Sequence, residues 1–215
     1  YPELHHFNNT NPIALKMFFG YKLTEVNNPF YSHLLRWNNS NHIKKHFAEK
    51  IKDSLKDYSP FDELLSRLPG NFNSWDSLAK SQWLESSIFM SGYLLSSQGD
   101  RVSMANSVEG RYPFLDYRVI EFAATLPPDF KLHGLNEKFI LKRMMNNRLP
   151  ESVLKRPKQA YRAPIAKSFL SSPAREYVMD LLSEKDLNKT GLFSYQAVQK
   201  LLQKISTGDM VTEIE

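Results

Sequence analysis

The stretch SVEGRYPFLDYRVIEFAATLPP, residues 107–128, combines two charged residues, an apolar segment and the signals of a helix. Glu109 and Arg111 stand just ahead of an apolar Pro-Phe-Leu wedge. Because an unpaired charge beside apolar residues is costly, we predict that the two side chains form a buried, mutually satisfied pair. Such a pair would orient neighbouring groups and act mainly as structural support for a site.

The second half of this stretch predicts a helix. Asp116 supplies an N-cap, and Pro127 and Pro128 end the run. Apolar residues recur at helical spacing, so one face of the helix is expected to be buried. The residues expected inside are Val119, Ile120, Ala123 and Leu126.

Helical signals continue in both directions along the chain. One example is Ser59, a predicted N-cap that is followed by Pro60 at the first helical position and by Asp62 at the capping-box position. We find no alternating run of β-branched residues and no internal repeat. Helices are predicted over residues 11–20, 42–58, 59–70, 74–98, 116–126, 136–150, 150–157, 172–186 and 194–206. The expected fold is mainly α, a helical bundle with short connections.

The composition excludes several classes of protein. The 215 residues include no cysteine, so a disulfide framework, a thiolate metal site and a cysteine nucleophile are ruled out. No apolar run approaches the roughly 18 residues that span a bilayer. The most apolar stretch, residues 86–97, is interpreted as a buried helix, and the N-terminus does not resemble a signal peptide. We expect a cytoplasmic protein without a membrane partner.

Common metal and phosphate motifs are absent from the sequence. There is no glycine-rich phosphate loop and no HExxH zinc motif. His42 and His46 are four residues apart and offer half of a metal site, but no third ligand is evident. We therefore predict no metal site in this chain.

The net charge of +5 is concentrated in one segment. From Glu137 to Lys167, only Glu137 and Glu151 oppose a series of basic residues. Such a concentration favours an anionic partner, namely nucleotide phosphates, nucleic acid or an acidic neighbour. A solvated helix face is the structural alternative. The basic residues are Lys138, Lys142, Arg143, Arg148, Lys155, Arg156, Lys158, Arg162 and Lys167.

Lys158 is the most informative residue of this segment. Pro157 precedes it, and the residue before a proline favours extended backbone. We therefore expect Lys158 on a loop, from which a rigid scaffold can aim a cation at an anion. Arg156 and Arg162 would reinforce its field.

Three groups of residues occur in the order and spacing of a known family. The first is Asp100, Arg101, Ser103, Met104, Ala105, Ser107, Glu109, Arg111, Pro113, Phe114, Leu115 and Asp116. The second is Glu137, Lys138, Leu141 and Lys142, and the third is Leu149, Pro150, Arg156, Pro157 and Lys158. Over residues 94–165 the chain resembles the C-terminal half of the synthetase domain of glutamine-hydrolysing asparagine synthetases.

The resemblance implies a fold and partners. Residues 1–215 look like the helical half of an α/β adenine-nucleotide-hydrolase-like synthetase domain whose parallel sheet is missing. The family's S-G-G-x-D-S loop and S-G-E-G-x-D-E segment do not occur in the chain. We therefore expect a piece of a longer protein, inactive by itself. Its partners would be an N-terminal glutaminase domain and the ATP-binding half of the synthetase domain.

The resemblance also implies a reaction. ATP adenylates aspartate, and glutamine-derived ammonia then yields asparagine, AMP and pyrophosphate. ATP and magnesium would serve the complete enzyme, with no cofactor tightly bound to this chain. Lys158 is implied to be catalytic and to bind ATP and pyrophosphate, since a fixed ammonium stabilises the departing polyanion. Lys138 matches a second position near pyrophosphate.

The remaining motif residues receive supporting roles. The resemblance places Glu109 and Arg111 near the acyl-adenylate, and Glu109 is counted with the catalytic residues. Arg111, Asp116 and Arg101 are taken as structural or as support for the catalytic groups.

Several alternatives stay open at this stage. A related synthetase with another substrate, of the β-lactam synthetase or peptide-modifying cyclase type, shares the R-P-K and P-F-L-D neighbourhoods. A non-catalytic basic helical module is a further alternative; nucleic-acid binding would weaken steeply with salt, and we expect none. A degenerate scaffold, the identity of the acceptor acid and a homodimer are also left open.

Overall fold

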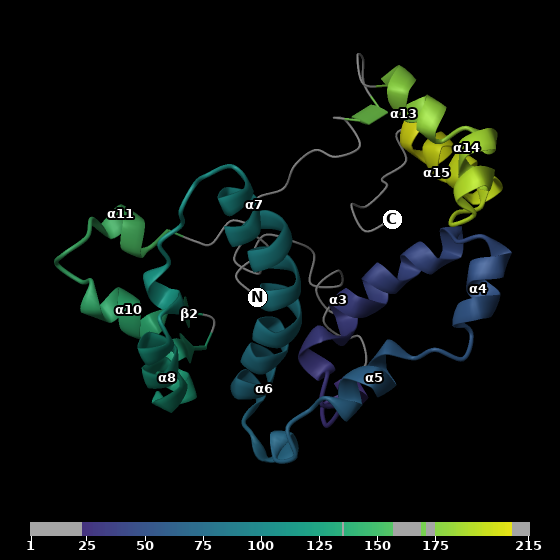
Figure 1. Cartoon of the computed structure of the whole chain (residues 1–215). Helices are drawn as coiled ribbons and strands as arrows, with labels where there is room; N and C mark the ends of the chain where they lie inside the picture. The colour runs from purple at the N-terminus through teal and green to yellow at the C-terminus, as the bar shows by residue number, and fades with distance from the viewer. Residues whose placement is uncertain (1–22, 135, 157–168, 171–174, 208–215) are drawn as a thin grey trace. The chain divides into compact units, whose positions relative to one another are not determined.

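The computed structural model describes residues 23–134, 136–156, 169–170 and 175–207 (Figure 1). The chain divides into two compact units, which are described separately. Unit 1 comprises Tyr1–Ser32 and Asn71–Ala160, and unit 2 comprises His33–Gly70 and Tyr161–Glu215. In the described residues the protein is mainly α with one two-stranded antiparallel sheet, which confirms the predicted fold class. None of these residues forms a parallel sheet.

Unit 1 contains one longer helical path, several short helices and a small hairpin. Its elements are η1 (Leu23–Glu25), η3 (Phe72–Ser74), α6 (Ser77–Leu84), η4 (Glu85–Gln98), α7 (Asp100–Ala105), η5 (Pro113–Leu115), α8 (Tyr117–Thr125), α9 (Pro128–Lys131), β1 (Leu132–His133), β2 (Asn136–Glu137), α10 (Phe139–Met144) and α11 (Glu151–Leu154).

Unit 2 takes its helices from two separate parts of the sequence. They are α3 (Tyr31–Asn41, which begins in unit 1), η2 (His42–His46), α4 (Glu49–Leu55), α5 (Pro60–Ser66), α13 (Arg175–Leu181), α14 (Glu184–Thr190) and α15 (Tyr195–Thr207). The helix predicted over residues 11–20 lies outside the described residues.

The longest helical path is α6 followed by η4. The Asp76 carboxylate accepts a hydrogen bond from the Ala79 amide at 2.9 Å and so caps α6. At Glu85 the helix widens into a π-helix, η4, which runs to Gln98 and confirms the helix predicted there. The buried apolar side chains among the described residues of unit 1 are Phe30, Phe72 and Leu84, and the Phe72 ring lies 5.5 Å from the Trp83 ring.

The prediction that residues 86–97 are buried is wrong. No residue of η4 is buried, and Ile88, Phe89 and Leu94 are each 37% exposed. The reason is packing: among the described elements, η4 is contacted chiefly by α6 and α7, its neighbours in sequence. One apolar face of η4 therefore faces solvent in the described part of the chain.

The helix predicted after Asp116 is confirmed as α8, but its predicted burial is wrong. Val119 is 38% and Ile120 is 49% exposed, while Ala123 and Leu126 are half-buried. Among the described elements, α8 packs mainly against the short η5, which is too small to cover an apolar helix face.

A small hairpin precedes α10 and was not predicted. Leu132 pairs with Glu137 and His133 with Asn136, and Gly134 adopts a positive φ of 58° in the turn. Strands of two residues are too short to show an alternating pattern in the sequence.

The single helix predicted over residues 42–58 is wrong, because it breaks into η2 and α4. Phe47 and Ala48 between them are extended. Phe47 bridges to Phe193, their rings lying 5.5 Å apart, and the Ser194 amide donates to the His46 carbonyl at 2.8 Å. Backbone pairing with a distant segment thus replaces one helical turn.

Helix caps in unit 2 follow the sequence closely. The Ser59 hydroxyl accepts from the Asp62 amide at 3.3 Å, as predicted for α5. Ser183 caps α14 and divides the helix predicted over residues 172–186 into α13 and α14. Within the described chain, no helix combines the length and apolar character needed to cross a membrane.

Candidate functional site

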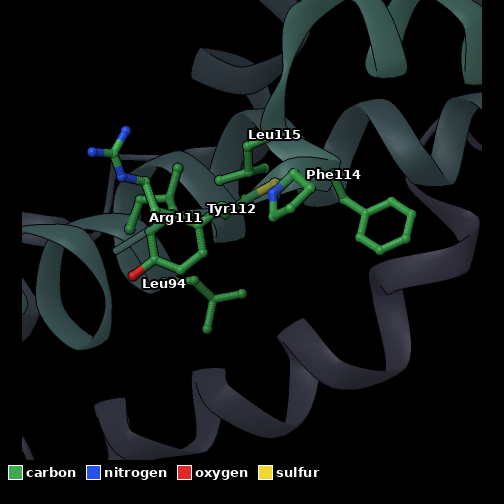
Figure 2. A pocket seen from close by; sticks show the side chains of 8 residues that line it. Leu94, Arg111, Tyr112, Phe114 and Leu115 are labelled. Atoms are coloured by element: carbon green, nitrogen blue, oxygen red, sulfur yellow. The ribbon is translucent and has the colours of Figure 1, made fainter. Parts of the chain in front are cut away.

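An apolar groove lies in unit 1 between η4 and the segment before α8. Its cavity volume is about 350 Å³. Figure 2 shows Arg111 at one end of the labelled side chains, Phe114 at the other, and Leu94 and Tyr112 between them. The full lining is Met90, Leu94, Leu95, Arg111, Tyr112, Pro113, Phe114 and Leu115. Residues 111–115, the Arg-Tyr-Pro-Phe-Leu part of the motif, therefore form one wall of the groove.

Local backbone signals place this wall. The single turn of η5 begins at Pro113, whose fixed φ suits the first helical position, and the Leu115 amide donates to the Tyr112 carbonyl at 2.8 Å. The Tyr112 ring lies over Gly110, so closely that a β-carbon at position 110 would overlap it. Gly110 thus allows Tyr112 to line the groove, a role that the sequence analysis missed.

The predicted pairing of Glu109 with Arg111 is confirmed, and its predicted burial is wrong. The Arg111 Nη2 atom lies 2.9 Å from the Glu109 Oε1 atom. The two side chains are 83% and 66% exposed, respectively. An exposed ion pair contributes only about 0–1 kcal/mol to stability, so the pair is not a folding requirement. Both charges are exposed, and Arg111 also lines the groove.

Asp116 is fully engaged in local structure. Its Oδ1 accepts from the Arg118 amide at 2.9 Å and from Arg118 Nε at 3.0 Å, while Arg118 Nη2 donates to Oδ2 at 2.7 Å. These hydrogen bonds hold the pKa of the Asp116 carboxyl below its ordinary value and raise the pKa of Arg118. The predicted capping of α8 by Asp116 is confirmed.

Lys138 sits at a special backbone position. It is exposed, precedes α10, and adopts the left-handed conformation with φ 55°. A non-glycine residue in this region costs free energy, and such outliers concentrate at functional sites. Nearby, Lys142 Nζ donates to Asn136 Oδ1 at 2.8 Å and braces the hairpin.

Two further basic residues of this segment have partners within the chain. Lys155 pairs with Glu151 at 2.5 Å, and the Arg143 guanidinium lies over the Phe139 ring at 5.7 Å. Arg156 is exposed, as is Arg101 in the first turn of α7.

Lys158 lies outside the described residues, as do Arg162 and Lys167. The loop position expected for Lys158 and its binding of ATP and pyrophosphate therefore stay predictions.

Metal ligands do not converge in the described part of the chain. No group of three or more histidine, aspartate or glutamate side chains is placed to hold an ion there. His42 and His46 both lie in η2 in unit 2, and among the described residues no further side chains join them to form such a group.

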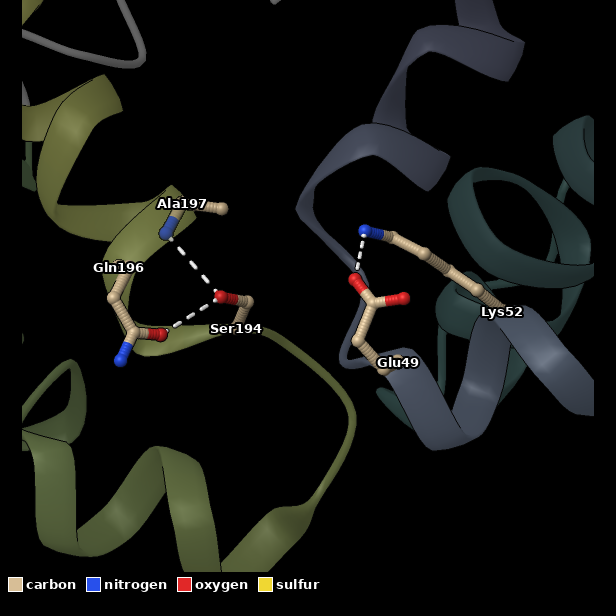
Figure 3. A network of polar contacts seen from close by, with 5 residues as sticks. All are labelled: Glu49, Lys52, Ser194, Gln196 and Ala197. Carbon is tan, nitrogen blue, oxygen red and sulfur yellow. Dashed lines mark hydrogen bonds and ion pairs between the residues drawn. The ribbon is translucent and has the colours of Figure 1, made fainter.

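The polar contacts of unit 2 stabilise helix starts (Figure 3). Before α15, the Ser194 hydroxyl donates to Gln196 Oε1 at 3.1 Å and accepts from the Ala197 amide at 3.4 Å. In α4, Lys52 pairs with Glu49 at 2.7 Å. These contacts are ordinary capping and i,i+3 pairs, and they add no chemistry to the groove of unit 1.

Comparison with known proteins gives one family. The sequence model described as asparagine synthase matches residues 13–213. Glutamine-hydrolyzing asparagine synthetase 1 of Bacillus subtilis is 30% identical over 144 residues, which cover 65% of this chain and 22% of that protein. Asparagine synthetase 3 of the same organism is 28% identical over 157 residues, or 71% and 25% of the two chains.

A relative with a different name is equally similar. The protein named amidase chyE of Penicillium rubens is 29% identical over 139 residues, which cover 62% of this chain and 20% of that protein. The matched part thus spans about a fifth of the length of these relatives. No solved structure matches the chain.

Proposed function

The chain belongs to the asparagine synthase family, and we propose from this premise that it is the helical part of an ATP-dependent amidoligase. The family match over residues 13–213 is the observation that carries the proposal. In the proposed reaction, an aspartate carboxylate attacks the α-phosphorus of ATP and pyrophosphate leaves. Ammonia then attacks the acyl carbon, a proton is released and AMP departs, which leaves asparagine.

The residues of this chain act in the adenylation half of that reaction. Lys158 and Lys138 carry the positive charge that stabilises the departing pyrophosphate. Glu109 and Arg111 orient the acyl end at the mouth of the groove. The exposure of this pair supports the assignment, because exposed charges are open to a ligand and contribute little to folding.

We propose that magnesium serves the complete enzyme together with ATP. The described residues include no converging set of three ligands for the ion, so we assign no magnesium ligand among them. The roles assigned to this chain's own residues rest on their cations and hydrogen-bonding groups.

We also propose that the 215 residues do not catalyse ligation by themselves. The sequence contains neither the S-G-G-x-D-S loop nor the S-G-E-G-x-D-E segment that the family uses for ATP. Ammonia would come from glutamine that a separate N-terminal glutaminase domain hydrolyses; the two Bacillus relatives are named glutamine-hydrolyzing.

The test is release of pyrophosphate by the full-length protein that carries this chain. ATP and ammonium chloride are supplied with aspartate, and glutamate serves as the mismatched acid. We expect release with aspartate and background release with glutamate or without acid. Absence of release with every acid tested contradicts the proposed ligase activity.

A second candidate keeps the adenylation and changes the acid. Two similar relatives are named amidases rather than asparagine synthetases, so membership of the family does not by itself assign aspartate as the acid. The β-lactam synthetases and peptide-modifying cyclases share the P-F-L-D neighbourhood, residues 113–116 here, and the R-P-K neighbourhood, residues 156–158 here. Pyrophosphate release with a larger carboxylic acid, but not with aspartate, supports this candidate and excludes asparagine synthesis.

A further inference from the structure

The end of α7 contains a serine where the backbone calls for glycine. Val108 donates its amide to the Ser103 carbonyl at 2.8 Å, and Ser107 donates to the Met104 carbonyl at 3.1 Å. This is the hydrogen-bond pattern of a Schellman motif, with Ser107 at the left-handed position. The φ of Ser107 is 59°. Glycine adopts this conformation without the steric penalty of a β-carbon, and is the usual residue there.

Left-handed residues other than glycine are few in the described part of the chain. Among the described residues they are Ser107, Lys138 and Asn147. Asparagine tolerates this conformation comparatively well, so Asn147 needs no special explanation. Ser107 and Lys138 both fall within the motif segments that mark the proposed site.

The Ser107 side chain does not account for its own backbone conformation. The residue is exposed, and its hydroxyl makes no hydrogen bond to any described residue. The two backbone hydrogen bonds that close the motif would form equally well with glycine. What serine adds is one hydroxyl, located two residues before Glu109.

We infer that the Ser107 hydroxyl is a substrate-contacting group, which donates a hydrogen bond to an anionic oxygen of the acid substrate. This inference rests on the proposed function and adds a residue to its site. The left-handed turn ends α7 and starts the segment that carries Glu109 and Arg111. Arg111 lines the groove, so the Ser107 hydroxyl lies in the same short segment as a groove residue. A hydroxyl that faces a carboxylate forms a charge-assisted hydrogen bond, which is stronger than a neutral one.

Replacement by glycine separates the two roles of this position. Ser107→Gly removes the hydroxyl and also removes the steric penalty of a β-carbon in the left-handed conformation. Ser107→Ala removes the hydroxyl but keeps the β-carbon and its penalty. Asn147→Gly is the matched control, since it relieves a left-handed residue outside the motif segments. All variants are made in the full-length protein that carries this chain.

The measurements are the thermal midpoint and kcat/KM for pyrophosphate release, with the acid and ATP varied separately. We expect Ser107→Gly and Ser107→Ala to lower kcat/KM for the acid by roughly tenfold, the value of one hydrogen bond to a charged group. The KM for ATP stays within about twofold of wild type, because uniform ATP binding is untouched. The thermal midpoint of Ser107→Gly is equal to or above wild type, and Asn147→Gly keeps wild-type activity.

Two results overturn the inference. Wild-type kcat/KM in Ser107→Gly shows that the serine is only a tolerated turn residue, and a lowered thermal midpoint shows that the left-handed assignment is wrong. If the wild-type protein itself releases no pyrophosphate with any acid, the proposed function fails and the inference falls with it.

Discussion

Asp116 shows at the residue scale how one carboxylate fixes the start of α8. It caps the helix and holds Arg118 by two side-chain hydrogen bonds. Because its pKa is lowered from the ordinary value of 3.8, its contribution to stability is complete above that pH. The contribution is lost as the pH falls through the lower, folded-state pKa.

We therefore predict that Asp116→Asn loses this part of the acid dependence but keeps the cap, since asparagine is an equally good N-cap. Asp116→Ala loses both and is the less stable of the two at neutral pH. Urea unfolding at pH 6 and pH 3 measures the difference. Equal loss of stability on acidification in wild type and Asp116→Asn is the result that would count against the proposed role of the charge.

Glu109 and Arg111 give the second prediction at this scale. Because the pair is exposed, Glu109→Gln should change the free energy of unfolding by less than about 0.5 kcal/mol. The same variant should lower pyrophosphate release at least about tenfold, since the carboxylate orients the acyl end.

Glu49→Gln provides the matched control for Glu109. It breaks an exposed ion pair with Lys52 in unit 2 and is expected to leave activity unchanged. If Glu109→Gln is destabilised but fully active, the pair is structural after all.

Gly99 joins η4 to α7 and sets the geometry between these elements. A β-carbon at this position would lie 2.7 Å from the Leu94 carbonyl oxygen, a backbone atom that cannot turn aside. We predict that Gly99→Ala destabilises the protein by about 1–3 kcal/mol, as overpacking usually does.

Gly92, inside η4, is the control for Gly99. Nothing lies within 4 Å of a β-carbon at position 92, so Gly92→Ala should stabilise the helix by up to about 1 kcal/mol. Denaturant midpoints of the two variants test the pair. A Gly99→Ala protein as stable as wild type would show that the backbone at this junction does not approach Leu94 so closely.

Signals from residues adjacent in sequence predicted the helices better than they predicted which side chains are buried. The caps at Ser59 and Asp116 and the limits of α8 follow from residues adjacent in sequence, and all were confirmed. The break at Phe47 depends on pairing with Phe193, almost 150 residues away, which no local pattern reveals.

Periodicity predicts which face of a helix is apolar, not what covers it. The apolar positions of η4 and α8 were therefore predicted correctly, but the prediction that they belong to a core was wrong. The same limit applies to the site, where the Glu109–Arg111 pair was predictable from sequence separation and its exposure was not.

At the scale of the whole molecule, the residues assigned to the proposed reaction lie in unit 1 and not in unit 2. The groove, the Glu109–Arg111 pair, Ser107 and Lys138 all belong to unit 1. The described part of unit 2 is held by helix caps and the pairing of residues 46–48 with residues 192–194. The central claim is that unit 1 supplies cations to the adenylation step of an amidoligase, with Lys158 foremost.

The most direct test is acid-dependent exchange of labelled pyrophosphate into ATP by the full-length protein and its Lys158→Ala variant. Lys200→Ala, in α15 of unit 2, is the control for removal of an exposed lysine. The account predicts that Lys158→Ala slows exchange about 100-fold or more, as loss of a charge-stabilising group does, while glutamine hydrolysis and Lys200→Ala stay at wild-type rates. Equal exchange rates in Lys158→Ala and wild type would contradict it.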